Sequence, residues 1–332
     1  MTERAGAPTS GQPHSGPNPG PDPGLDSGHT PAPNAGPNCG PNPGPNSGAG
    51  LGISLVLAGA ASTQAGAGVG VLALPALGPA GVVGMRQLVA TCVLLPIARP
   101  PIRRLTWSQW WPVLLLAASL ASMNLLIYSA FARIGLGLAV TLEFLGPLVL
   151  GIVGSRSRID LLVAIAAGIG VYVLVLPGPS SNVLGIAFGL AAGACWAAYI
   201  LASRIAGKRL PGIQATALAM GLSTAVYLPL LVVLASRAAA GEIGWQPFAF
   251  AAAAGVLSSA IPYALDIIAL RRLTAPVFGV LMSIHPVFAA FAGLVVLGQV
   301  LDAHEWIGIL IVVLANAVGV WSRRPRPPAP RD

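Results

Sequence analysis

Residues 139–154 read AVTLEFLGPLVLGIVG, and residues 278–293 read FGVLMSIHPVFAAFAG. Each stretch belongs to an apolar run that is long enough to cross a bilayer as a helix, and each holds one ionisable residue near a proline. The stretches match at a shift of 139 positions, where Leu142 pairs with Leu281, Pro147 with Pro286 and Gly154 with Gly293. The match indicates a helical membrane protein built from a repeated unit.

The repeat extends beyond these two stretches. The same shift pairs four more positions, which are Ser119 with Ser258, Ala121 with Ala260, Ala130 with Ala269 and Arg133 with Arg272. A unit of five spans is odd, so its two copies lie in the membrane in opposite orientations. Inverted repeats place a binding site between the halves near the bilayer midplane and favour alternating access. The repeat therefore predicts a carrier.

The composition excludes a soluble globular protein. Of the 332 residues, 55% are hydrophobic and only 8% are charged, whereas soluble domains have roughly 25% charged residues. The mean hydropathy is +0.77. A net charge of +8 suggests nucleic acid binding in a soluble chain, but here most arginines flank apolar runs. We therefore expect a lipid bilayer as the surroundings and no nucleic acid partner.

Ten transmembrane helices can be placed in the chain, and the basic residues orient them. Positively charged side chains resist translocation, so they accumulate in cytoplasmic segments. With both termini in the cytoplasm, 15 of the 18 basic residues lie on that side. The expected spans are 52–75, 79–98, 110–131, 137–154, 159–177, 183–203, 212–235, 247–270, 275–299 and 304–321. The fold class is thus an all-α polytopic membrane protein with two inverted five-helix repeats.

The spans group into two units flanked by polar ends. Residues 1–50 contain 12 prolines and 11 glycines and hold no apolar face, which predicts a disordered tail. Residues 51–178 form the first five-helix repeat and residues 179–322 the second. Residues 323–332 form a basic cytoplasmic tail.

The ionisable residues inside the spans are the first candidates for function, because charge is expensive in a bilayer. Arg86 and Glu143 lie at similar depth and form either a structural ion pair or part of a binding site. Asp266 either faces a cavity or pairs with the arginines that follow it. His285 lies near midplane, as a hydrogen-bonded helix contact or as a proton-sensitive group.

Prolines and polar aromatic residues indicate where a cavity lies. Pro147, Pro262 and Pro286 each remove one helical hydrogen bond and free a carbonyl group. Five further side chains either line this cavity or make interhelical contacts, namely Asn124, Tyr128, Trp196, Tyr199 and Tyr263. The glycines at 185, 189 and 193 repeat every fourth residue, a pattern typical of close helix packing. We expect the glycines at 66, 68 and 70 to serve packing as well.

Motifs for other chemistry are missing from the sequence. Lys208 follows a glycine but precedes Arg209, so the chain has no Walker A loop of its own. His304–Glu305 lacks the second histidine of a zinc protease motif, and the three cysteines lie far apart. We therefore expect no cofactor, no metal and no enzyme activity. Transport would be secondary, without ATP.

Four segments resemble the drug/metabolite transporter superfamily, and within it the EamA type that exports threonine and homoserine from bacteria. They are AVTLEFLGPLVL (139–150), GACWAAYILASRIAG (193–207), LSSAIPYALDIIALRRL (257–273) and FGVLMSIHPVFAAFAGLVVLGQVL (278–301). The resemblance implies ten helices in two inverted repeats and efflux of small metabolites, amino acids among them, driven by protons. It nominates Glu143, Trp196, Tyr199, Tyr263 and Asp266 for the site.

Two positions depart from the pattern of the family. Where the family reads MSxEP in its ninth span, this chain has His285, and where it reads LGE, this chain has Gln299. The departures remove two carboxylates that the resemblance would assign to proton coupling. His285 could replace one of them, whereas Gln299 cannot titrate.

The sequence thus favours a secondary exporter of threonine/homoserine-like amino acids in the bacterial plasma membrane. Arg86 with Glu143 or Asp266 would bind the charged ends of a zwitterionic small molecule, and the side chains of Asn124, Tyr128, Trp196, Tyr199 and Tyr263 would surround it. Glu143, Asp266 and His285 are the candidates for proton coupling. A passive pore is the alternative, although polar positions are few and separate. An intramembrane enzyme would need a nucleophile or metal site that the sequence does not show.

Overall fold

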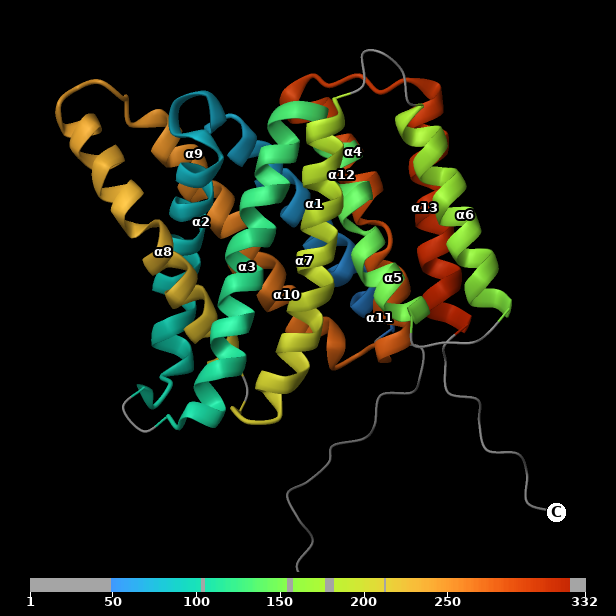
Figure 1. Cartoon of the computed structure of the whole chain (residues 1–332), viewed down its shortest axis with the longest axis horizontal. Helices are drawn as coiled ribbons and strands as arrows, with labels where there is room; N and C mark the ends of the chain where they lie inside the picture. The colour runs from blue at the N-terminus through green and yellow to red at the C-terminus, as the bar shows by residue number, and fades with distance from the viewer. Residues whose placement is uncertain (1–48, 103–104, 154–157, 177–181, 212, 323–332) are drawn as a thin grey trace, which may run out of the picture. The chain divides into compact units, whose positions relative to one another are not determined.

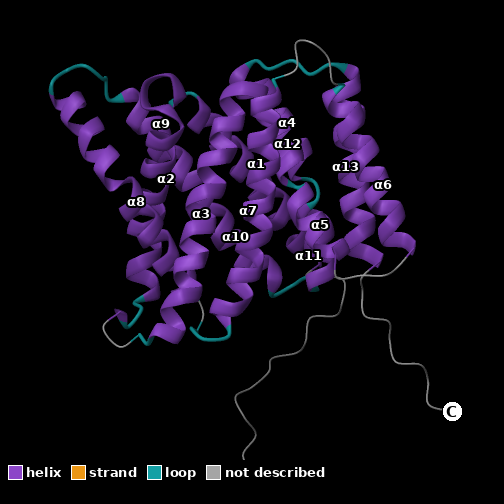
Figure 2. Ribbon diagram, in the orientation of Figure 1, coloured by secondary structure: helices purple, strands orange, loops and turns teal. Residues whose placement is uncertain are grey.

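The computed structural model describes residues 49–102, 105–153, 158–176, 182–211 and 213–322, where the regular structure is helical (Figures 1 and 2). The helices are α1 (Ala49–Val71), α2 (Leu74–Ala98), α3 (Trp107–Ile134), α4 (Leu136–Glu143), α5 (Leu145–Val153), α6 (Arg158–Val175), α7 (Val183–Gly207), α8 (Gln214–Ala239), α9 (Gln246–Gly255), the π-helical turn η2 (Val256–Ala260), α10 (Ile261–Leu270), α11 (Ala275–Met282), α12 (His285–Leu297) and α13 (Ala303–Ser322).

The helices confirm an all-α polytopic membrane protein. Within the described residues, nine helical segments are long and apolar enough to cross a membrane, and they match nine of the ten expected spans. The other expected span, 247–270, is helical throughout, as α9, η2 and α10 in direct succession. This segment is not one of the nine that are long and apolar enough to cross a membrane.

Several boundaries differ from the expectation. The first helix begins at Ala49, so the last two residues of the expected tail 1–50 belong to α1. The second helix begins at Leu74 rather than at residue 79. It bends at Gly78, which has a φ of 65° and lies directly before Pro79. Most of the expected disordered tail, 1–48, and the basic tail 323–332 lie outside the described residues.

The fourth and ninth spans are each broken in the middle. Helix α4 ends at Glu143, because Pro147 lacks the N–H group that would bond to the Glu143 carbonyl one turn earlier. Helix α11 ends at Met282, and Pro286 stands in the same relation to the Met282 carbonyl. Both α4 and α11 are 8 residues long, and their bounds differ by the shift of 139 positions found in the sequence.

Helix contacts repeat in the same way. Helix α1 packs against α9, η2, α10 and α12, and α7 packs against α3, α4 and α5. These two sets are equivalent if the first five spans correspond to the last five. Helix α2 packs against α8, and α6 against α13, which run side by side at the right of Figure 1. The contacts support the repeat, and the domain bounds 51–178 and 179–322 stay a prediction.

Glycines permit the closest of these approaches, as the four-residue pattern predicts. A Cβ atom on Gly185 would lie 2.8 Å from the Cβ of Arg133, and one on Gly189 would lie 3.1 Å from the Cβ of Leu142. A Cβ on Gly193 would lie 2.8 Å from the Glu143 carbonyl oxygen. Helix α7 therefore packs closely against the break between α4 and α5.

The π-helical turn η2 is the third interruption, and Pro262 explains it. Pro262 cannot donate to the Ser258 carbonyl, so the helix widens over the preceding turn. Two hydroxyl groups bind this turn to α1: Ser62 Oγ donates to the Leu257 carbonyl at 2.8 Å, and Ser258 Oγ donates to the Thr63 carbonyl at 3.1 Å. Such turns occur often at functional sites.

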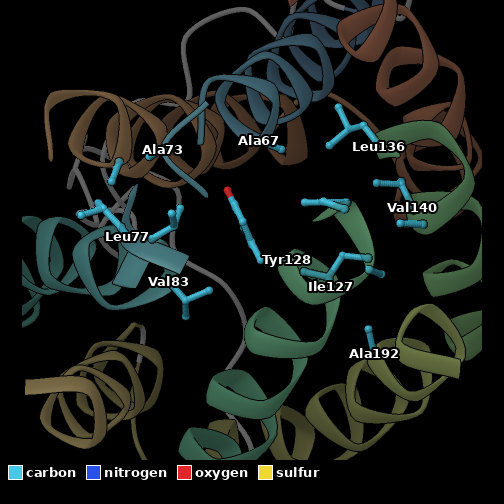
Figure 3. Packing of buried hydrophobic residues seen from close by; sticks show 14 of the residues in the cluster. Ala67, Ala73, Leu77, Val83, Ile127, Tyr128, Leu136, Val140 and Ala192 are labelled. Carbon is cyan, nitrogen blue, oxygen red and sulfur yellow. The ribbon is translucent and has the colours of Figure 1, made fainter. Parts of the chain in front are cut away.

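A buried apolar cluster lies between α1, α2, α3, α4 and α7 (Figure 3). The Tyr128 side chain is fully buried within it and points from α3 toward α1 near Ala67. Large apolar side chains are exposed elsewhere, for example Leu161 and Leu162 on α6 and Leu314 on α13. Exposed apolar side chains on the outer helices are expected where lipid replaces water.

Candidate functional site

Two adjoining cavities lie among the interrupted helices. The first has a volume of about 250 Å³ and is lined by residues of α1, α2, α3, α4, α7, η2 and α12. The second has a volume of about 380 Å³ and extends toward α8 and α10. Eight residues line both, so the cavities adjoin; these are Thr63, Arg86, Leu120, Met123, Asn124, Trp196, Tyr199 and Ser258.

Most residues selected from the sequence line these cavities. Arg86, Asn124, Trp196 and Tyr199 line both; Tyr128, Glu143 and His285 line the first; Asp266 lines the second. Tyr263 lies on α10, but its side chain is outside the described part of the structure. The structure thus brings together residues from both halves of the chain, as a site between repeats requires.

Arg86 lies against the ring of Tyr128. Its guanidinium carbon is 5.4 Å from the centre of the Tyr128 ring, a cation–π distance. The Tyr128 hydroxyl is buried and has no hydrogen-bond partner within the described residues. A Cβ on Gly70 would lie 2.6 Å from this hydroxyl, so the glycine leaves room for the tyrosine.

Glu143 is the last residue of α4 and lines the same cavity as Arg86. The sequence placed the two at one level, and they do share one cavity. Among the described residues, however, no ion pair within 4.0 Å joins them. An ion pair of 2.8 Å lies elsewhere, between the exposed side chains of Arg237 and Glu242. In this conformation Glu143 and Arg86 line the same cavity without a direct ion pair between them.

Asp266 faces the second cavity from α10. Its Oδ1 atom is buried and has no hydrogen-bond partner among the described residues. Within the same described part, no ion pair links it to the arginines that follow; Arg272 instead donates to the Ile268 carbonyl at 3.2 Å. The geometry therefore favours the cavity position over the pairing that the sequence left open.

His285 is held by two neighbours at the start of α12. The Gln64 side-chain nitrogen lies 3.1 Å from His285 Nδ1, and the Phe144 ring stacks on the imidazole with a centroid distance of 5.6 Å. Trp196 packs edge-on against Phe144 at 4.6 Å. The other ring nitrogen, Nε2, is buried and has no hydrogen-bond partner within the described residues.

Gln299 lies outside both cavities. Its side-chain oxygen accepts a hydrogen bond of 3.0 Å from the backbone N–H of Leu136, the first residue of α4. The first N–H groups of a helix have no partner within the helix, and a side-chain acceptor satisfies one of them. A neutral amide serves this purpose, so the departure at Gln299 removes no carboxylate from the cavities of this structure.

Several cavity residues were not selected from the sequence. Gln64, Thr63 and Ser258 are polar residues within expected spans, and that polarity is the signal that could have nominated them. Met123 and Phe144 are apolar and look like any lipid-facing or packing residue. Their role becomes visible only where helices distant in sequence meet.

The described helices and the two adjoining cavities make this a polytopic membrane protein with an internal site that holds ionisable side chains. A model of the EamA-like transporter family matches residues 183–320. The threonine/homoserine exporter RhtA of Escherichia coli (strain K12) is 33% identical over 269 residues, which cover 80% of this chain and 90% of that protein. RhtA of Salmonella typhimurium (strain SL1344) matches with the same values. This chain belongs to the EamA-like transporter family.

A more distant relative is the uncharacterized transporter YwfM of Bacillus subtilis (strain 168). It is 24% identical over 231 residues, which cover 65% of this chain and 76% of that protein. The family and the apolar helices together make the chain a multi-pass membrane transporter of small molecules in a lipid bilayer.

Proposed function

We propose that the chain exports threonine, homoserine or similar small amino acids across the bacterial plasma membrane by alternating access. The observation that carries this proposal is the pair of adjoining cavities, which are lined by Arg86, Glu143 and Asp266 with no ion pair among these three in the described residues. The similarity to RhtA, a threonine/homoserine exporter, supports this choice of substrate.

The cavity residues suit a zwitterion. Arg86 can bind a carboxylate with several N–H groups, and Glu143 or Asp266 can bind an ammonium group. Charged groups of a substrate lose their hydration in the bilayer, so both need partners of opposite charge. The aromatic rings of Trp196 and Tyr199 line both cavities and would cover the aliphatic part. Asn124, Tyr128 and Tyr263 complete the proposed set.

Protons are the proposed coupling ion, with Glu143, Asp266 and His285 as candidates. A carboxylate without a fixed partner can bind either a proton or the ammonium group of the substrate, but not both at once. If protons enter from outside as the amino acid leaves, this competition couples the two flows. In support, no ion pair joins Glu143 to Arg86 among the described residues, and Asp266 Oδ1 has no hydrogen-bond partner there.

The proposed orientation has both termini in the cytoplasm, because 15 of the 18 basic residues would otherwise lie outside. Single cysteines at residues 78, 180 and 302, in a background without the three native cysteines, should react with an impermeant maleimide in intact cells. Labelling only in inverted membrane vesicles would contradict this orientation.

Counterflow in proteoliposomes tests the proposed function. Liposomes loaded with unlabelled threonine should transiently accumulate labelled threonine or homoserine added outside, and a pH gradient should drive net transport. A passive pore equilibrates the label without accumulation. Failure to exchange any member of a panel of amino acids would contradict the choice of substrate.

A further inference from the structure

Gln64 and His285 are in contact although they lie far apart in the sequence. They are 221 residues apart, on α1 and α12, and both line the first cavity. The contact distance between Gln64 Nε2 and His285 Nδ1 is 3.1 Å. Phe144 stacks on the face of the imidazole with an interplanar angle of 27°. The ring is thus fixed by a hydrogen bond at one edge and by an aromatic ring on one face.

This contact determines which nitrogen carries the proton of a neutral imidazole. In this arrangement the amide nitrogen of Gln64, which is a donor only, faces Nδ1, so a neutral His285 ring accepts the hydrogen bond at Nδ1. The proton of the neutral ring then lies on Nε2, on the opposite side of the ring from Gln64. Nε2 is buried and has no hydrogen-bond partner among the described residues. A buried donor without a partner in a native structure requires an explanation, such as a bound molecule.

The charged groups of the cavity indicate what this donor binds. Arg86 and Glu143 line the same cavity, and Asp266 lines the adjoining one. Under the proposed function these residues bind the carboxylate and ammonium groups of an amino acid. The remaining polar group of threonine or homoserine is a neutral hydroxyl, which matches a neutral N–H donor.

We propose that His285 Nε2–H donates a hydrogen bond to the side-chain hydroxyl of the transported amino acid, and that Gln64 positions this donor. The inference rests on the proposed function and adds a specificity determinant to it. His285 is then a substrate-binding residue, Gln64 is a positioning residue, and the proton-coupling role stays with Glu143 or Asp266.

A single analogue tests the hydroxyl contact. Removing the hydroxyl from either threonine or homoserine gives α-aminobutyrate, which keeps both charged groups. The measurement is the ratio of kcat/KM for threonine to that for α-aminobutyrate, from counterflow with purified protein in liposomes. Loss of one neutral hydrogen bond should lower this ratio by about tenfold.

Four variants separate binding from folding. His285→Phe removes the donor but keeps a ring that can stack on Phe144, so the ratio should fall through slower threonine transport. Gln64→Met removes the positioning contact on another helix and should also lower the ratio. His285→Gln keeps an N–H donor and should retain most of the ratio. His304→Phe is the matched control, because His304 lies at the start of α13 outside both cavities.

Each outcome decides the inference. If the wild-type chain exchanges threonine but the ratio is unchanged in His285→Phe and Gln64→Met, only the hydroxyl contact is overturned. An equal loss of threonine and α-aminobutyrate transport in these variants also overturns it. If His285→Phe does not fold, Gln64→Met carries the test. A wild-type chain that exchanges no hydroxy amino acid overturns the proposed function together with this inference.

Discussion

The two broken spans, α4–α5 and α11–α12, have the same backbone geometry at the break but different side chains. Both break one turn before a proline, and the residues at the breaks, Phe144 and Ser283, have nearly the same backbone angles (φ −66°, ψ −13° and φ −63°, ψ −12°). At the shift of 139 positions, however, Glu143 corresponds to Met282 and Gly146 to His285. The shared proline accounts for the interruption, and the residues that are not shared supply the polar groups.

The two breaks also differ in how closely the neighbouring helix approaches. At Gly146 a Cβ atom would collide with the backbone of Gly193, so α7 closes tightly on the first break. The equivalent position in the second break holds the imidazole of His285, which reaches α1 through Gln64. The second break therefore has room for a side chain at this position, whereas the backbone of α7 fills the same space at the first break.

The largest expected effect comes from placing a side chain at Gly146, where α7 packs closely on the first break. We expect Gly146→Val to abolish folding or to lower the melting temperature strongly, because its side chain would have to displace the backbone of α7. The measurement is thermal unfolding of detergent-purified protein together with membrane abundance. Gly168→Val on α6 is the control, since a Cβ there meets nothing within 4 Å. Equal stability of both variants would show that α7 does not pack tightly on this break.

The next effect concerns the acidic residue that only the first break has. We expect Glu143→Gln to reduce threonine exchange by about a hundredfold at normal abundance, through loss of a charge-assisted contact to substrate. Met282→Leu, at the equivalent position outside both cavities, should change exchange little. If Glu143→Gln instead destabilises the protein, Glu143 is a structural partner of Arg86.

Local patterns in the sequence predicted much of this comparison. Pro147, Pro262 and Pro286 predicted the three interruptions, because each removes a hydrogen bond from its own helix. A proline alone does not suffice, since Pro229 lies within the continuous helix α8. Ionisable residues within apolar spans predicted Arg86, Glu143, Asp266 and His285 as candidates, and all four line the cavities. These signals need no knowledge of which helices touch.

The contacts of glutamine residues could not be predicted in this way. Gln64 meets His285 from 221 residues away, and Gln299 meets Leu136 from 163 residues away. Such pairings depend on helix packing across the two repeats, which no periodicity within one span encodes. For Gln299 the family pattern suggested a lost coupling residue, whereas the structure shows an acceptor at a helix start.

A smaller effect should come from removing the hydrogen bond between Gln299 and the start of α4. We expect Gln299→Ala to lower the free energy of unfolding by about 1 kcal/mol, because the Leu136 N–H loses its acceptor. Gln299→Glu keeps an acceptor oxygen and should be nearly neutral. The equivalent helix α11 starts after Thr274 without a side-chain cap, so Thr274→Ala provides the matched comparison and should change stability less. Denaturant or thermal unfolding in detergent measures the difference.

The smallest effect, and the sharpest test of the second break, is His285→Gln. If His285 donates to the substrate as a neutral ring, glutamine can replace the donor, and we expect exchange within about twofold of wild type. The pH dependence of export should then stay that of the wild type, because the residue that titrates would be Glu143 or Asp266. The measurement is proton-driven threonine export from proteoliposomes over a range of external pH.

The opposite result would reverse the assignment of roles between the two breaks. A flattened pH profile in His285→Gln, with abundance unchanged, would show that the imidazole itself takes up the proton, since glutamine cannot titrate. The second break would then supply the coupling group and the first break, through Glu143, the contact to the ammonium group of the substrate. Comparing the pH profiles of His285→Gln, Glu143→Gln and Asp266→Asn under the same conditions therefore decides which of the three candidates takes up the proton.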